Sequence, residues 1–239
     1  MSESKNTHHL TEVLCGLWFN PKSNIWDSTF FGKYYEKIEK LGYSEKQEQK
    51  GVQIKFELKA DSGKAVPSSE MSEMEPRMVF KDTKNNFATL MAANFISFHK
   101  LEPYISWEKL IELQVVPGMK EYQEIGLGNE IAQVQALYLN KYTLNIDEKL
   151  SDYFSFIPSI QDFGSGVESN LGFQSQYELE PNLMQQIKLN SIVDPVSNTK
   201  NVFLECSCFA FAHEGKGWEE LSKQAHDQNN VVFKKITKK

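Results

Sequence analysis

Phe95-Ile-Ser-Phe-His99, followed by Trp107-Glu-Lys-Leu110, is the stretch that decides the fold, because a similar stretch occurs again later in the chain. The second copy reads Phe209-Ala-Phe-Ala-His213, followed by Trp218-Glu-Glu-Leu221. In each copy an apolar strand leads to a histidine, a polar turn and a helix that opens on Trp-Glu-x-x-Leu. Such a repeated unit is typical of a protein built from two related halves. The turn is longer in the first copy, which is the weakest point of the comparison.

Each half also opens on an apolar strand, Glu12-Val-Leu-Cys-Gly-Leu-Trp-Phe19 in the first and Ile131 to Asn140 in the second. A helix, two or three antiparallel strands and the tryptophan helix follow. We therefore predict an α+β fold with two similar lobes, a tandem repeat in which antiparallel sheets are each covered by helices. Residues 1–126 would form the first lobe and residues 127–239 the second, packed as one compact unit. The two apolar strands are candidates for the centre of a shared sheet or for the interface between the lobes.

Two further segments have readable patterns. Residues 25–41 carry aromatic and aliphatic side chains three and four apart, which predicts a helix with one apolar face, and Gly42 follows it as a C-terminal cap would. Residues 59–75 are rich in Ser, Glu and Lys and show no periodicity, which predicts a long loop.

Composition limits the classes of function. The net charge of −6 does not favour nucleic-acid binding, because phosphate contacts need concentrated Lys and Arg, and only the tail Lys234 to Lys239 is basic. No apolar stretch approaches the roughly 18 residues of a membrane helix, so we expect a cytoplasmic protein that does not bind membranes. Three cysteines, Cys15, Cys206 and Cys208, are expected to be free, buried thiols.

The search for catalytic chemistry finds few candidates. His99 and His213 each end an apolar strand, where a histidine with a carboxylate nearby could act as a general base, or could bond only to the backbone. Cys206 and Cys208 with His213 lack a fourth ligand at a familiar spacing, so no metal site is predicted. No phosphate-binding loop or nucleophile elbow is present, so no cofactor and no catalytic residue are assigned.

Tyr138 and Asn140, at the end of the second apolar strand, are the best candidates for functional polar groups, because Asn seldom lies free at a strand end. The predicted binding residues are therefore Tyr138, Asn140, His99 and His213. The alternative for Tyr138 is core packing, and for Asn140 a hydrogen bond at the strand end. We interpret Trp107 and Trp218 as equivalent anchors that hold one helix on each half.

The chain resembles an uncharacterised, sporadically distributed bacterial protein family of roughly this length that is known by a number. The resemblance rests on the strand Glu12 to Phe19, the unit from Phe95 to Trp107, the strand with Tyr138-Leu-Asn-Lys141, and Val232-Phe233 in the last helix. The family pattern has Arg where Leu137 stands here. The family brings no catalytic residues, and its distribution implies a bacterial accessory system such as phage defence or a toxin–antitoxin pair.

These observations favour a non-catalytic binding or assembly protein that acts on a protein partner or as a homo-oligomer. An enzyme is the less favoured alternative, a hydrolase or nuclease that uses His99 or His213. A nucleic-acid-binding module is the third hypothesis.

Overall fold

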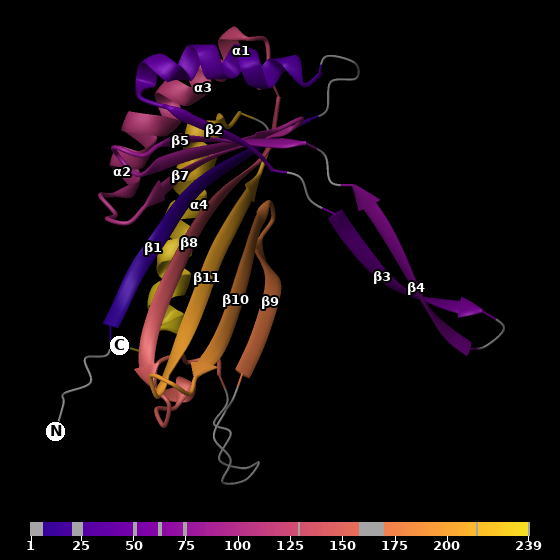
Figure 1. Ribbon diagram of the computed structural model, residues 1–239, viewed down its shortest axis with the longest axis vertical. Coiled ribbons are helices and arrows are strands. Elements are labelled where there is room, and N and C mark those ends of the chain that lie inside the picture. The colour runs from indigo at the N-terminus through magenta and orange to yellow at the C-terminus, as the bar shows by residue number, and fades with distance from the viewer. Residues whose placement is uncertain are drawn as a thin grey trace.

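The two apolar strands pair with each other at the centre of one sheet in the computed structural model of the protein (Figure 1). The structure describes residues 7–20, 26–49, 52–61, 64–73, 76–128, 130–157, 170–213 and 215–238. Within these ranges nine strands form an antiparallel sheet in the order β2-β5-β6-β7-β1-β8-β11-β10-β9. The strands are β1 (Thr7–Phe19), β2 (Glu45–Gln49), β5 (Arg77–Asp82), β6 (Phe87–Ala92), β7 (Phe95–Leu101), β8 (Ile131–Asn145), β9 (Asn170–Glu180), β10 (Leu183–Asp194) and β11 (Thr199–Phe211).

The predicted α+β fold of two lobes, each with its own helix-covered sheet, is therefore wrong. The sheet runs without a break from the first half of the chain into the second, because β1 pairs with β7 on one side and with β8 on the other. Strands outweigh helices in the described residues, so the molecule is mostly β. The two apolar strands, predicted to lie either at the centre of a shared sheet or at an interface between lobes, lie at the centre of the sheet. The division at residues 126 and 127 stays a prediction.

A separate hairpin contradicts the loop that we predicted over residues 59–75. Strands β3 (Val52–Asp61) and β4 (Lys64–Glu73) pair as a two-stranded antiparallel sheet. The second half of β4 reads Ser-Ser-Glu-Met-Ser-Glu, which has too few apolar residues for the sequence pattern to indicate a strand.

The helices pack on one face of the large sheet. They are α1 (Thr29–Ile38), α2 (Trp107–Leu110), α3 (Val116–Glu124) and α4 (Trp218–Ile236), with the short turns η1 (Glu39–Leu41), the π-helical η2 (Ile111–Val115) and η3 (Leu150–Asp152). Gly42 caps η1, the turn that continues α1, with a φ of 104°, so the predicted C-terminal cap is present at the end of this turn.

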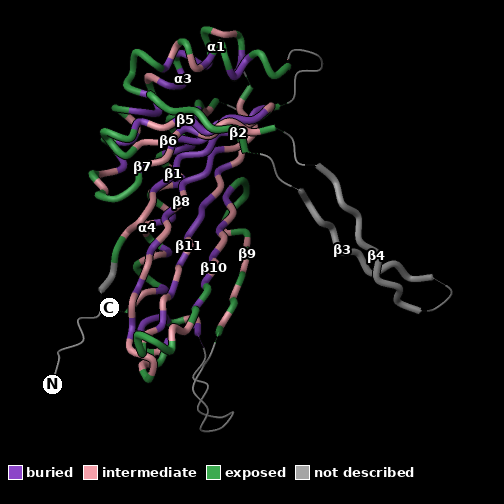
Figure 2. Tube along the Cα trace, viewed as in Figure 1, coloured by how far each residue is buried: buried purple, intermediate pink, exposed green. Residues whose placement is uncertain are grey.

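One row of cross-strand neighbours shows which face the helices cover, because directly opposed residues share a face. The row is Phe80, Thr89, Phe98, Cys15, Ala136, Cys208 and Gln185, and all of its members are buried. Phe80 contacts Tyr34 of α1, and Gln185 bonds to Asn229 of α4. In Figure 2 the buried residues concentrate in the central strands and on the inner sides of the helices. The site described next lies where α2 and α4 meet this face.

Candidate functional site

A pocket of about 300 Å³ opens between β8, the start of α2 and the C-terminal half of α4. Strand β8 contributes Tyr138 and Asn140, which are two apart and so point to the same face of the sheet. The segment before α2 and half-buried residues of α4 complete the wall. The remaining lining residues are Leu10, Tyr104, Ile105, Ser106, Trp107, Glu108, His226, Asn230 and Phe233.

A chain of hydrogen bonds runs along the floor of this pocket. Asn230 Nδ2 lies 3.1 Å from His226 Nε2 and donates to it, so the proton of the neutral imidazole is on Nδ1. His226 Nδ1 donates to the Tyr138 hydroxyl, and that hydroxyl in turn donates to Tyr104. The polar groups therefore form a connected, directional series, Asn230 to His226 to Tyr138 to Tyr104.

Burial keeps this chain uncharged. Desolvation lowers the pKa of the His226 imidazole, against the opposite effect of Asp227 and Glu108 nearby. Burial also raises the pKa of Tyr104 to about 12, and it raises the pKa of Tyr138 further, together with the neighbouring Tyr104. At neutral pH the pocket floor is thus polar but neutral.

The indole of Trp107 forms the apolar part of the wall. Its ring stacks on the His226 imidazole with a centroid distance of 4.8 Å and an interplanar angle of 9°, and it meets Tyr138 edge-on at 6.3 Å. Trp107 begins α2, where the Ser106 hydroxyl accepts a hydrogen bond from the Lys109 amide as an N-terminal cap. This cap fixes the direction of α2 and so the position of the indole.

One acidic group stands at the pocket. Glu108 follows Trp107 in the first turn of α2, and hydrogen bonds from its own backbone amide and from Ser106 lower the pKa of its carboxyl. None of the pocket-lining residues in the described part of the chain is a Lys or Arg. The pocket therefore combines aromatic and aliphatic side chains with hydrogen-bonding groups and one negative charge.

The structure brings together two of the four predicted binding residues, Tyr138 and Asn140. His226 is not among the predicted binding residues, although it stacks on Trp107. Helical spacing could have indicated it. Ser222, Ala225 and Asn229 are spaced three and four apart on the buried face of α4, and His226 lies beside that row.

His99 lies elsewhere, in a second hydrogen-bonded group on the other face of the sheet. Its Nδ1 is 2.5 Å from Oε1 of Glu12 on β1, and its Nε2 is 2.7 Å from the Ser97 hydroxyl. The His99 side chain is 16% exposed and the Glu12 side chain 26%, whereas Ser97 is only 1% exposed. The order hydroxyl, imidazole, carboxylate is that of a nucleophile, a base and an orienting acid.

His213 lies apart from both groups. Its Nδ1 is 3.1 Å from the carbonyl oxygen of Phe211 at the end of β11. Trp218 is buried at the start of α4, in the same apolar cluster as Trp107. The binding roles of Tyr138, Asn140, His99 and His213 stay predictions.

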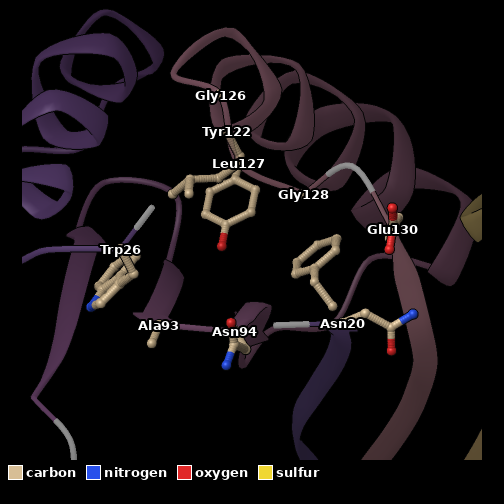
Figure 3. A pocket seen from close by; sticks show the side chains of 10 residues that line it. Asn20, Trp26, Ala93, Asn94, Tyr122, Gly126, Leu127, Gly128 and Glu130 are labelled. Carbon is tan, nitrogen blue, oxygen red and sulfur yellow. The ribbon is translucent and has the colours of Figure 1, made fainter. Parts of the chain in front are cut away.

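A smaller hollow lies at the other end of β1, between that strand and the end of α3 (Figure 3). Its volume is about 40 Å³, and the Tyr122 hydroxyl points into it. Phe19 packs against Tyr122 with a centroid distance of 5.4 Å. This volume holds one or a few water molecules, so the pocket beside Tyr138 is the better candidate for a ligand.

Other features bear on the class of protein. Cys15, Cys206 and Cys208 are buried and unpaired, as predicted, and burial raises the pKa of Cys206 and of Cys208 to about 12. Within the described ranges, no three His, Cys, Asp or Glu side chains gather as metal ligands would. Among the helices that the structure describes, none has the length and apolar character to cross a membrane.

The chain matches no protein-family model and no curated protein at a significant level. The resemblance to a bacterial family therefore stays a prediction.

Proposed function

We propose that the protein is a non-catalytic binding protein whose ligand site is the pocket beside Tyr138. The observation that carries the proposal is the pocket itself, in which Trp107 and Tyr138 meet a neutral hydrogen-bonded chain. Ligand sites are typically concave and mostly apolar, with a few placed polar groups. The volume of about 300 Å³ is at the lower end of the range for small-molecule sites.

The lining residues define the chemistry of the ligand. Trp107, Tyr104 and Phe233 favour a flat or branched apolar group, and the Asn230 side chain offers a hydrogen bond to a polar end. Glu108 is the one charged lining residue, so a cationic or neutral ligand fits and an anionic one does not. A small amphipathic amine, or an apolar side chain next to a lysine in a peptide, has this character.

The test is a screen of small amphipathic amines and their carboxylate analogues by ligand-observed NMR. We expect amines to bind and the matched carboxylates not to bind. Ile105 lies at the pocket and is 41% exposed, so Ile105→Arg should reduce amine binding without unfolding the protein. Leu113→Arg is the matched control, because Leu113 is 55% exposed and lies outside this pocket. Equal binding by both variants would contradict the proposal.

A role in a bacterial accessory system, such as phage defence or a toxin–antitoxin pair, belongs to the same proposal and is supported by the resemblance alone. The genes beside this one test it. Neighbours from such a system would support the role, and housekeeping neighbours would contradict it.

A second candidate function is hydrolysis through Ser97, His99 and Glu12, favoured by the order and distances of their hydrogen bonds. Two features weigh against it. The first is that the Ser97 hydroxyl is buried. The second is that Ser97 lies within strand β7, which pairs with β1 on one side and β6 on the other, so the backbone N–H groups that would stabilise an oxyanion are used in the sheet. A fluorophosphonate probe tests this function: labelling that is lost in Ser97→Ala and in His99→Ala would support it, and no labelling would exclude it.

A further inference from the structure

Strand β9 is a free edge of the large sheet in the part of the chain that the structure describes. It is the last strand in the order and pairs with β10 alone. Edge strands present unpaired N–H and C=O groups, which proteins usually protect by short length, charge or proline. The opposite edge, β2, has these protections: it is five residues long, fully exposed and reads Glu-Lys-Gln-Glu-Gln.

Strand β9 is less protected, because its only charged residues are Glu178 and Glu180 at one end. It is 11 residues long, reads Asn-Leu-Gly-Phe-Gln-Ser-Gln-Tyr-Glu-Leu-Glu, and contains no lysine, arginine or proline. Its odd-numbered residues, from Leu171 to Leu179, are half-buried against the helix-covered side, and its even-numbered residues are exposed. The amide of Leu171 bonds to Ser191 Oγ on β10. Since successive residues turn their backbone groups to opposite sides, the even-numbered residues up to Glu178 turn theirs to the free side. A register shift between Glu178 and Glu180 interrupts the alternation at that end of the strand.

The sequence of β9 is self-complementary about Ser175. If a second copy pairs antiparallel with Ser175 opposite Ser175, Leu171 meets Leu179 and Phe173 meets Tyr177, all on the half-buried face. On the exposed face Gln174 meets Gln176. Each apolar residue thus meets an apolar residue and each amide meets an amide.

The charges of β9 fit the same register. Both acidic residues lie at one end, so Glu178 would lie opposite Gly172, and Glu180 opposite Asn170. No carboxylate faces another, although the strand has a net negative charge. A parallel pairing in register would instead stack Glu178 on Glu178 and Glu180 on Glu180, which is unfavourable.

We propose that β9 is a self-association edge and that its occupant is a second copy of this chain, paired antiparallel about a two-fold axis at Ser175. The axis is perpendicular to the sheet, so the helix-covered faces of the two copies are continuous. Phe173 and Tyr177, half-buried in one copy, then cover each other in the pair. This surface is distant in the sheet order from the pocket beside Tyr138, with β11 and β10 between β8 and β9.

Sedimentation of the full chain with charge variants tests the contact. The native chain is expected to form dimers when its concentration is raised to about 100 µM, because weak contacts of this kind are populated there. The double variant Gln174→Lys with Gln176→Lys places two Lys–Lys pairs across the axis and should raise the dissociation constant about tenfold or more. The double variant Gln47→Lys with Gln49→Lys on β2 is the control and should leave the dimer unchanged.

Mixing gives the sharper result. The β9 lysine variant mixed with Gln174→Glu, Gln176→Glu should form a heterodimer, because each lysine then faces a glutamate. Ser175→Cys should form an intermolecular disulfide on mild oxidation, whereas Gln174→Cys should not, since residue 174 faces residue 176. The native cysteines are buried and do not compete.

A native chain that is monomeric at this concentration would overturn the proposal, and so would a dimer that the β9 lysines leave intact. A dimer in which Gln174→Cys cross-links and Ser175→Cys does not would overturn the register about Ser175. Failure of this contact leaves the ligand screen on the Tyr138 pocket unaffected, so the two proposals fail separately.

Discussion

Gly118 lets α3 approach the sheet closely. A Cβ atom placed on Gly118 would lie 2.3 Å from Cε1 of Phe98 on β7 and 3.1 Å from the Tyr34 hydroxyl oxygen. Both neighbours are fully buried, so neither can move freely. We expect Gly118→Ala to lower the free energy of unfolding by about 1–3 kcal/mol, measured by urea denaturation.

Gly32 provides the matched control, because it is also a helical glycine but a Cβ atom placed on it would have no neighbour within 4 Å. Gly32→Ala should raise the free energy of unfolding by about 0.5–1 kcal/mol, since alanine loses less backbone entropy on folding. Equal effects of the two substitutions would contradict the close approach at Gly118.

His226 is expected to make the stability depend on pH. Burial lowers its pKa below the ordinary value of 6.5, so the unfolded chain takes up the proton first as the pH falls. Above the ordinary pKa of 6.5, neutral His226 makes its full contribution to the free energy of unfolding. This contribution is lost as the pH falls from that value toward the pKa of the folded state. Asp227, Glu108 and Lys223 are the charged groups around it.

The measurement compares unfolding free energies at about pH 7.5 and about pH 5.5. His226→Gln should lose less stability between these pH values than the native chain does. An unchanged pH dependence in His226→Gln would show that the imidazole is not buried in its neutral form.

At the scale of elements, the buried Asn229 amide links α4 to the sheet. Asn229 Nδ2 donates to the carbonyl oxygens of Ala136 on β8 and Cys206 on β11, and Asn229 Oδ1 accepts from Gln185 on β10. Its side chain thus ties the helix to three strands. Asn229→Ala leaves buried carbonyl and amide groups without this partner and should cost about 1–3 kcal/mol.

Gln228, the half-buried residue before it on α4, is the control. Gln228→Ala should change the free energy of unfolding by less than about 0.5 kcal/mol. If Asn229→Ala were equally mild, the amide would not anchor the helix.

Elements with a strong apolar period could be predicted from the sequence, and their partners could not. The strands at Glu12 and Ile131 and both tryptophan helices form. Of the helix predicted over residues 25–41, residues 29–38 are α-helical and residues 39–41 form η1. Strand β4 was missed because Ser and Glu replace apolar residues on it. Pairing of β1 with β8 depends on residues about 120 positions apart, and local patterns carry no information about such contacts.

In the candidate site, too, single residues could be predicted from the sequence but their contacts could not. Tyr138 and Asn140 could be singled out because they end an apolar strand. The contact of His226 with Trp107 depends on how α4 crosses β8, and the contact of His99 with Glu12 depends on the register that places Leu14 opposite His99. Neither geometry is encoded in residue spacing.

At the scale of the whole molecule, the continuous sheet has a consequence for unfolding. Because β1 and β8 are the central pair, each half of the chain holds the partner strand of the other. We expect one cooperative transition, with tryptophan fluorescence and far-ultraviolet circular dichroism giving the same midpoint in urea. Two separated transitions would indicate two independent lobes.

The central claim is that the pocket beside Tyr138 binds a ligand, and the indole N–H resonance of Trp107 tests it most directly. The chain has four tryptophans, which give four indole signals in a proton–nitrogen NMR spectrum, and Trp107→Phe assigns the relevant one. An amine that binds should shift the Trp107 signal and leave those of Trp18 and Trp26 in place. A bound amine that moves Trp18 or Trp26 while Trp107 stays unchanged, or a screen in which no amine binds, would contradict the account.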